Sequence, residues 1–246
     1  MFQFIGCGSA FHTKLGNNSA YLKNGSHLFM IDCGSANFDR ILRAQLLVGV
    51  DEIAVLVTHL HPDHVGSLGD LLFYSYYSVP PAAQVTATVL TPKKLSHDFR
   101  ALMKLMGVTD KYYRHVEISG TYRPVGMGDV TRIEPVPVQH SRGLTCFGYL
   151  LDVGGKHVYY SGDANMIPTD VLEALKSGEL DYMYQDTSKA DYAGNVHLSL
   201  RQLTEFVPQQ VRGRVYCMHL DPPFLPEEAI SLGFQVVSPL ELANLS

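Results

Sequence analysis

Four side chains that can bind a metal ion lie within six consecutive positions of the chain. They are His59, His61, Asp63 and His64. Imidazole nitrogens and carboxylate oxygens are ligands that a divalent ion such as zinc accepts. Because His59 and His61 alternate, both can point to the same side of an extended loop, whereas Asp63 and His64 can point elsewhere. The spacing therefore predicts one short loop that serves two ions, and it is denser than chance would give among eleven histidines.

A strand-like run precedes this loop and a helical pattern follows it. Residues 53–57 are apolar and rich in β-branched side chains, which is typical of a buried strand. Apolar residues then recur at helical spacing, so we expect a helix over 66–77 that ends before Pro80 and Pro81. The histidines would leave the carboxyl end of a strand, where a rigid sheet holds ligands within reach of a substrate.

Other strand-like runs end in further polar residues. Hairpins are predicted at Asn24-Gly25 and at Gly154-Gly155, because glycine and asparagine suit the tight turns that join two strands. Asp32 follows the first hairpin and is also readable as the N-cap of a helix over 36–48. Four candidate site residues follow predicted strands later in the chain, namely His140, Asp163, Asp186 and His219.

The composition is globular and acidic. The 246 residues are 46% hydrophobic and 17% charged, which fits one α/β domain over 1–246. A formal net charge of −5 argues against a protein that grips long nucleic acids. The chain opens with neither a basic region nor a long apolar stretch, so we expect no signal peptide, no membrane span and a cytoplasmic location. The four dispersed cysteines are expected to be buried and reduced.

The segment from His59 to His64 resembles the H-x-H-x-D-H signature of the metallo-β-lactamase superfamily. This resemblance implies a four-layer αββα sandwich and two divalent metal ions, zinc or else manganese. It implies that one ion is held by His59, His61 and His140. It implies that the second is held by Asp63, His64 and His219, that Asp163 bridges the two, and that Asp32 supports the metal loop.

Two such ions make a phosphodiester the natural target. Ions about 3.5–4 Å apart can share a water, lower its pKa and present hydroxide to phosphorus. The segments Gln185–Ser188 and His197–Ser199 resemble a pair of motifs in the tRNase Z-like phosphodiesterase branch. There an acidic residue orients a histidine that protonates the leaving group. The resemblance implies His197 as the general acid and Asp186 as its orienting partner, although that branch usually has glutamate at this position; Asp63 completes the expected catalytic set.

The substrate is expected to be small. The interval from His140 to Asp163 holds only one hairpin, which leaves no room for the arm with which tRNase Z grips tRNA. Residues 6–10 and 17–19 look similar to a compact group that includes cyclic-nucleotide phosphodiesterases and phage anti-Pycsar enzymes, which destroy cyclic mononucleotide signals. This resemblance implies a cyclic mononucleotide substrate and a homodimer. Tyr74 to Tyr77 could stack on a base, reach the partner's site or simply pack beneath a loop.

Two alternatives stay open at this point. One is an RNase Z-like nuclease or a 2′,3′-cyclic phosphodiesterase. The other is an acyl hydrolase of the lactamase or thioesterase type, which the pairing of Asp186 with His197 disfavours. Base preference is open in every case, because no motif in the sequence reads a base.

Overall fold

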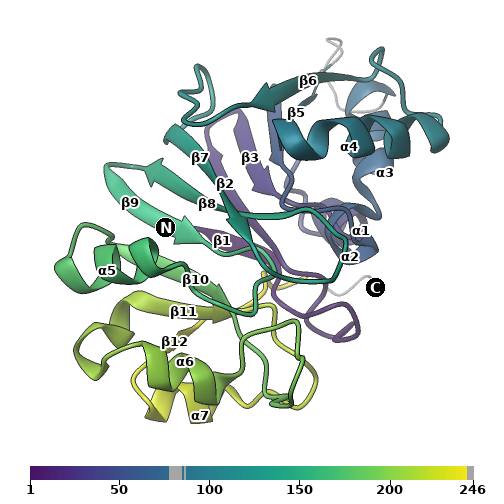
Figure 1. Ribbon diagram of the computed structural model, residues 1–246. Helices are drawn as coiled ribbons and strands as arrows, with labels where there is room; N and C mark the ends of the chain where they lie inside the picture. The colour runs from purple at the N-terminus through teal and green to yellow at the C-terminus, as the bar shows by residue number, and fades with distance from the viewer. Residues whose placement is uncertain (78–84, 86, 243–246) are drawn as a thin grey trace.

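Two six-stranded sheets pack face to face with helices outside them in the computed structural model, which describes residues 1–77, 85 and 87–242 (Figure 1). The first sheet contains β1 (Gln3–Gly6), β2 (Ser19–Asn24), β3 (His27–Ile31), β4 (Glu52–Leu56), β5 (Ala87–Pro92) and β6 (Tyr113–Ile118) in that order. The second contains β7 (Val130–Val138), β8 (Cys146–Val153), β9 (Lys156–Tyr160), β10 (Tyr182–Asp186), β11 (Val215–Met218) and β12 (Gln235–Val236). The expected αββα layering is confirmed.

Helices cover the outer faces of both sheets. Against the first sheet lie α1 (Asn37–Arg43), α3 (Leu68–Tyr77) and α4 (Lys93–Leu105), and the short α2 (Pro62–Val65) follows the carboxyl end of β4. On the side of the second sheet lie α5 (Thr169–Ser177), α6 (Leu200–Phe206), the 3₁₀ helix η1 (Gln209–Arg214) and α7 (Pro226–Ser231) (Figure 1). Among the described helices, none combines the length and the apolar character that crossing a bilayer requires.

The two halves of the chain share one strand pattern. In each sheet the first three strands are antiparallel, and the last three are added in parallel. Parallel neighbours need a crossover connection, usually a helix, which explains why hairpins give way to helices partway through each half. No repeat is visible in the sequence, so the duplicated topology is apparent only in three dimensions.

Several turns and helices begin or end at residues other than those predicted. Both hairpins form, but the central residues of the first turn are Gly25 and Ser26, because Asn24 pairs with His27. Only Gly25 has a positive φ (59°), as in a type II′ turn. The second turn has positive φ at both Gly154 (55°) and Gly155 (75°), as in a type I′ turn.

The helix predicted over 36–48 is shorter. It ends at Arg43 because Gln45 takes a left-handed conformation (φ 54°). The Gln45 N–H then bonds the Leu42 carbonyl, and the Leu46 N–H bonds the Ile41 carbonyl, which is a Schellman motif.

The helix predicted over 66–77 forms as α3, which begins at Leu68, and the separate short helix α2 precedes it. Pro62, whose ring presets a helical φ, opens α2 at its first position, so Asp63 and His64 lie on a helical turn and not on an extended loop. The described helix ends at Tyr77, and the prolines predicted to stop it lie outside the described residues.

Buried apolar side chains of both sheets form one contiguous core. Strands β3 and β4 are buried almost throughout, as expected for strands covered on both faces. All four cysteines are free and buried, in agreement with the sequence prediction. The core fixes the carboxyl ends of the parallel strands, and these ends present the candidate site.

Candidate active site

The candidate site lies where strand ends of the two sheets meet. In the first half, Asp32 follows β3 and the His59–His64 segment follows β4. In the second half, His140 follows β7, Asp163 follows β9, and His219 follows β11. Residues separated by more than 150 positions thereby come into contact, as His219 and Asp63 do. Asp32 and Asp163 follow the third strand of their respective sheets, which are equivalent positions in the duplicated topology.

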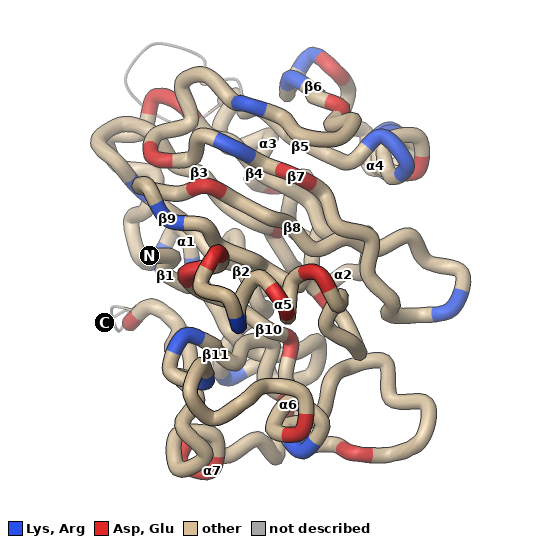
Figure 2. The backbone as a smooth tube through the Cα atoms, turned by 60° about the vertical axis from the view of Figure 1, so that its left-hand side comes forward, with Lys and Arg blue, Asp and Glu red and all other residues tan. Residues whose placement is uncertain are grey.

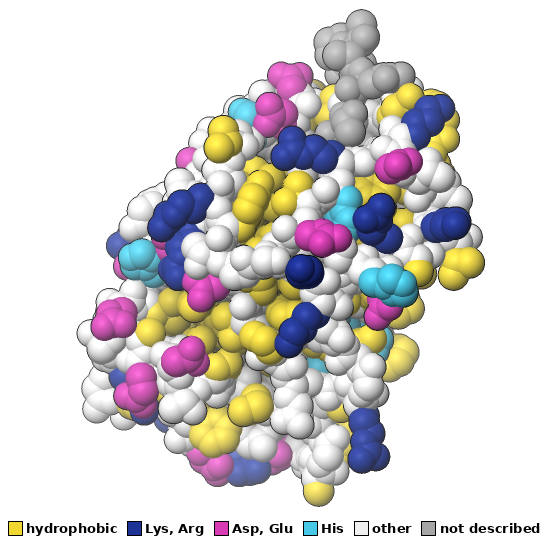
Figure 3. Space-filling view, turned by 45° about the horizontal axis from the view of Figure 1, so that its top comes forward, with side chains coloured by type: hydrophobic (Ala, Val, Ile, Leu, Met, Phe, Trp, Pro, Cys, Tyr) yellow, Lys and Arg dark blue, Asp and Glu magenta, His cyan; other side chains and the backbone are white. Residues whose placement is uncertain are grey.

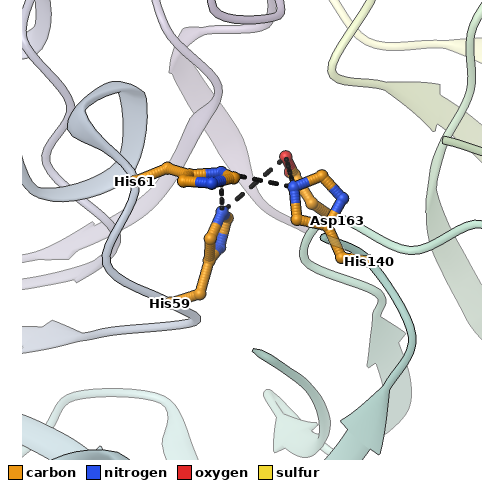
Figure 4. A group of neighbouring side chains, drawn as sticks. All are labelled: His59, His61, His140 and Asp163. Atoms are coloured by element: carbon orange, nitrogen blue, oxygen red, sulfur yellow. Dashed lines mark hydrogen bonds and ion pairs between the residues drawn. The ribbon is translucent and has the colours of Figure 1, made fainter. Parts of the chain in front are cut away.

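Three histidine nitrogens converge on one point. His61 Nδ1 lies 3.1 Å from His59 Nε2 and 3.3 Å from His140 Nε2 (Figure 4). His59 and His61 leave one loop, while His140 and Asp163 approach from the opposite sheet. Nitrogens bound about 2.0–2.1 Å from a tetrahedral zinc ion lie about 3.3 Å apart. The three nitrogens therefore fit a single ion.

A second cluster of two histidines and two carboxylates adjoins the first. Asp63 Oδ2 lies 3.4 Å from His64 Nε2 and 3.3 Å from His219 Nε2. Asp163 Oδ1 lies 3.2 Å from His64 Nε2, and Asp163 Oδ2 lies 3.3 Å from His219 Nε2. The ligand atoms of these four residues lie within 4.8 Å of one another, which is the arrangement a metal ion requires.

Asp163 belongs to both clusters. Its Oδ2 also lies 3.6 Å from His140 Nε2 and 3.9 Å from His59 Nε2. His64 Nε2 and Asp163 Oδ1 are buried and face each other at 3.2 Å, and neither forms a hydrogen bond with any described residue. Buried polar atoms without partners are costly, so the pair is best explained by a cation that binds both. The residues present fit two divalent ions with a shared carboxylate.

Burial and charge set the protonation of the clusters. Burial lowers the pKa of His59, His61 and His140, which keeps these imidazoles neutral as metal ligands must be. His219 behaves differently: burial opposes its charged form, but Asp163 and Asp186 raise its pKa to about 10. Similarly, Asp163 and Asp32 raise the pKa of His64 against the effect of burial. The raised pKa values show that the carboxylates of the second cluster favour positive charge at this place, and a bound cation would supply that charge.

Asp32 supports the candidate metal-binding segment His59–His64 through hydrogen bonds to Thr58 and His64. Its Oδ1 accepts from the Thr58 N–H at 2.8 Å, and its Oδ2 accepts from the Thr58 hydroxyl at 2.7 Å and from His64 Nδ1 at 2.8 Å. That last bond leaves His64 Nε2 free to face Asp163. The alternative interpretation of Asp32 as a helix N-cap is wrong, because Ala36 is the N-cap of α1 and both Asp32 oxygens bond Thr58 and His64.

Backbone strain is concentrated at the site. Of the three described non-glycine residues with positive φ, two are Asp32 (63°) and His219 (57°). Such conformations cost about 1–3 kcal/mol each and persist where the surroundings enforce them. Asn18, which is buried, accepts a hydrogen bond from the His219 N–H at 3.3 Å and donates one to the Tyr160 hydroxyl at 2.8 Å. Asn18 therefore holds the strained backbone that aims His219.

A carboxylate–histidine pair lies beside the second cluster. His197 Nδ1 lies 2.7 Å from Asp186 Oδ2, which also accepts the Ala164 N–H at 2.9 Å. The other oxygen, Oδ1, lies 3.4 Å from His219 Nδ1. Burial opposes the charged imidazole, but Asp186 raises the pKa of His197 above its ordinary value. The pair can hold a proton on His197, whose ring is stacked on that of His219 at 4.9 Å between centroids.

Six of the candidate site residues line one cavity of about 600 Å³, namely His61, Asp63, His140, Asp163, His197 and His219. Its wall also contains residues that the sequence analysis did not single out for the site, including Phe11, Thr13, Ser141 and Val196. No local pattern marks them, because each occurs singly in a loop. The tyrosines at 74–77, for which base stacking, a subunit contact and ordinary packing were all open, do not line this cavity: Tyr74 packs on Phe38, and Tyr76 and Tyr77 pack against Tyr112.

Comparison with known proteins gives consistent matches. The family model described as Anti-Pycsar protein Apyc1 matches residues 1–237. The Anti-Pycsar protein Apyc1 of Paenibacillus xerothermodurans is 28% identical over 231 residues, which cover 89% of this chain and 87% of that protein. Ribonuclease Z of Mycobacterium bovis is 28% identical over 175 residues, which cover 65% of this chain and 60% of that protein.

Solved structures match in fold. The metallo-beta-lactamase fold protein YhfI from Bacillus subtilis superposes with a TM-score of 0.72 at 16% identity, covering 98% of this chain and 95% of that chain. At this identity the likeness concerns the architecture alone. It identifies the two facing sheets and their outer helices as the metallo-β-lactamase fold.

Proposed function

Because the chain belongs to the Anti-Pycsar protein Apyc1 family and is a metal-dependent phosphodiester hydrolase, we propose that it opens cyclic mononucleotides. The ligand roles of the two clusters, the acid role of His197 and the orienting role of Asp186 are parts of this proposal. So is the extent of the catalytic unit, a single domain over residues 1–246.

The observation that best supports phosphodiester chemistry is the contact between Asp186 and His197. Hydrolysis of a phosphodiester expels an alkoxide, which needs a proton as it leaves. His197 has a raised pKa, lies against Asp186 and shares a cavity with His61 and Asp63. A histidine held through Nδ1 presents Nε2 to the cavity, which is the atom a general acid would use.

Two divalent ions bound here would neutralise charge on the phosphoryl oxygens and activate a water. The chain's own residues do the rest. Asp163 fixes the two clusters relative to each other, and Asp32 and Thr58 keep His64 oriented. As the bond from phosphorus to the leaving oxygen breaks, the proton on His197 Nε2 passes to that oxygen. Asp186 stabilises the imidazolium before the transfer and keeps the ring aligned.

The size and charge of the protein favour a small substrate. A cavity of about 600 Å³ is in the range of small-molecule sites. The stretch between His140 and Asp163 is occupied by the hairpin of β8 and β9, so no long arm is available there. Lys and Arg positions are scattered among Asp and Glu positions over the described backbone (Figure 2), and both signs are interspersed on the face shown in Figure 3. A long nucleic acid would need a continuous basic track.

Three further assignments accompany the proposal. Zinc is the ion that the histidine-rich donor sets favour, and manganese is the alternative. The enzyme acts in the cytoplasm. It acts as a homodimer, and we assign the subunit contact to the aromatic cluster of Tyr76, Tyr77 and Tyr112. The Lys111 ammonium lies 5.3 Å from the centroids of the Tyr76 and Tyr112 rings. Tyr77 is 63% exposed in one subunit, so it is available to a second copy.

The test is product analysis on the zinc-loaded protein. The panel contains 3′,5′- and 2′,3′-cyclic nucleotides, short RNA and a chromogenic phosphodiester. Opening of 3′,5′-cyclic mononucleotides, abolished by Asp63→Ala and strongly reduced by His197→Ala, is the expected result. Turnover of the chromogenic diester alone would contradict the cyclic-nucleotide assignment while leaving the phosphodiesterase in place.

A nuclease or 2′,3′-cyclic phosphodiesterase is the second candidate, because ribonuclease Z of Mycobacterium bovis aligns with about two thirds of this chain. Cleavage of RNA ends, or of 2′,3′-cyclic nucleotides, would favour it.

An acyl hydrolase needs no Asp186–His197 pair. Turnover of a thioester or lactam that survives His197→Ala would favour that class.

A further inference from the structure

Phe11 is an exposed aromatic side chain at the mouth of the active-site cavity. Its exposed fraction is 86%, yet it lines the same cavity as His61, Asp63 and His197. A single exposed apolar side chain is ordinary on a protein surface, so exposure alone indicates little. The position of Phe11 beside the two metal-binding clusters is what requires a function.

The turn that presents Phe11 is tied firmly to the site. The Gly8 N–H bonds the Gly16 carbonyl at 2.8 Å, which closes the turn at its base. The Leu220 carbonyl accepts from the Ser9 N–H at 2.9 Å and from His12 Nδ1 at 3.1 Å. Leu220 directly follows His219, so the turn is anchored next to a candidate metal ligand. The backbone that carries Phe11 is therefore fixed, so ligand binding has only the side chain left to order.

The cavity lining contains the two kinds of surface that a nucleotide needs. Its histidines and aspartates suit an anionic phosphate with metal ions, whereas Ala10, Phe11, Pro62 and Val196 are apolar. A flat base gains about 1–3 kcal/mol by stacking on an aromatic side chain, whatever its identity. Within the described lining of this cavity, Phe11 is the one aromatic residue apart from the histidines.

We propose that Phe11 stacks on the nucleobase of the substrate and is a substrate-binding residue of this enzyme. The assignment rests on the proposed function, which it deepens from a phosphodiester to a base-bearing one. Because every base offers a π-face, Phe11 confers affinity for nucleotides in general. Purines, which overlap the ring more fully, gain more from it than pyrimidines do.

The test compares matched substrates in the zinc-loaded full chain. One series is 3′,5′-cyclic nucleotides with each base, and the other is a 3′,5′-cyclic ribose phosphate with hydrogen in place of the base. Phe11→Ala is expected to raise KM for the nucleotides about 5- to 150-fold, most for purines, with kcat little changed. KM for the base-free compound should stay the same. Phe11→Trp should retain nucleotide affinity, and Phe11→Leu should not, although both are apolar.

Two controls make the result specific. Leu105→Ala removes an equally exposed side chain (87%) at the end of α4, outside the cavity, and should change neither series. Titration calorimetry of each compound into the parent protein and the Phe11→Ala variant gives dissociation constants without turnover. Sedimentation of both proteins shows whether the subunit state has changed.

The outcomes separate the inference from the proposed function. If the parent opens cyclic nucleotides and Phe11→Ala affects both series equally or neither, stacking is overturned and the function stands. If the parent opens none, the proposed function is overturned, and calorimetry still decides whether Phe11 favours base-bearing ligands. If Phe11→Ala breaks the dimer and weakens both series together, Phe11 is a subunit contact and the inference is wrong.

Discussion

Asp186 Oδ2 lies 2.7 Å from Nδ1 of His197, the candidate general acid beside the second candidate metal cluster. The other oxygen of the same carboxylate, Oδ1, lies 3.4 Å from His219 Nδ1. Asp186 is completely buried and lies at the end of β10, which aims it at both rings. One carboxylate therefore contacts both the candidate proton donor and a candidate metal ligand.

Removing the acid should slow the chemical step and leave the metal ions in place. For His197→Ala we expect kcat for an alkyl phosphodiester to fall about 10²- to 10⁴-fold, with zinc content unchanged. An ester with a very acidic leaving group needs no protonation, so its kcat should fall much less. Steady-state kinetics on both esters, with metal analysis of each protein, measures this. An equal loss on the two esters would contradict the acid role.

The pH profile should depend on Asp186. Asp186 raises the pKa of His197, so the ring is protonated below that pKa and activity falls as pH rises through it. Asp186→Asn removes the opposite charge and leaves burial, which lowers the pKa of a histidine. The alkaline limb of kcat should therefore move to lower pH. Asp186→Glu keeps the charge and should keep a profile close to that of the parent; a shift equal to that of the amide would refute the electrostatic account.

Metal removal should destabilise the protein without changing its fold. An ion present at 100 times its dissociation constant stabilises the folded state by about 2.7 kcal/mol per site. For a chain of this size that corresponds to a fall in Tm of about 5–11 °C per site on chelation. Differential scanning calorimetry with and without chelator, followed by zinc addition, measures the change. A Tm that chelation leaves unaltered would show that the clusters bind no stabilising ion.

Thr58 should tune metal affinity without touching an ion. Its hydroxyl donates to Asp32 at 2.7 Å and lies 3.1 Å from His59 Nδ1, so it links the supporting carboxylate to the first cluster. Loss of such an outer contact typically weakens metal binding about 10- to 100-fold. We expect weaker zinc binding of this size for Thr58→Val, which has the shape of threonine but no hydroxyl. Thr58→Ser retains the hydroxyl, and its zinc affinity should equal that of the parent. Competition with a zinc-binding dye gives the constants, and equal affinity for all three proteins would rule out the role.

The sequence predicted most elements closely because their signals are local. Strand β4 (Glu52–Leu56) forms within one residue of the predicted 53–57, and both glycine-containing hairpins form. The predicted helix boundaries were wrong where a single residue set the local backbone conformation. Gln45 ends α1 early by taking a left-handed φ that glycine usually takes, and Pro62 starts a short helix inside the predicted loop.

The candidate ligands could be named from the sequence, but their joint geometry could not. Spacing selected His59 to His64, and the family resemblance selected His140, Asp163 and His219 one by one. How they meet depends on the pairing order of twelve strands in two sheets, which no short-range pattern encodes. The same holds for the choice of ring nitrogen, since His61 turns Nδ1 to the first cluster whereas His59 and His140 turn Nε2.

By itself, then, the sequence determined the strands, the turns and the residue types able to bind metal, because alternation, turn chemistry and donor chemistry act over a few residues. Only the tertiary structure decided that Asp32 supports His64 and does not cap a helix, that Asn18 holds the strained backbone of His219, and that Phe11 faces the cavity. Each of these contacts joins segments far apart in the chain, and packing of the common core fixes them.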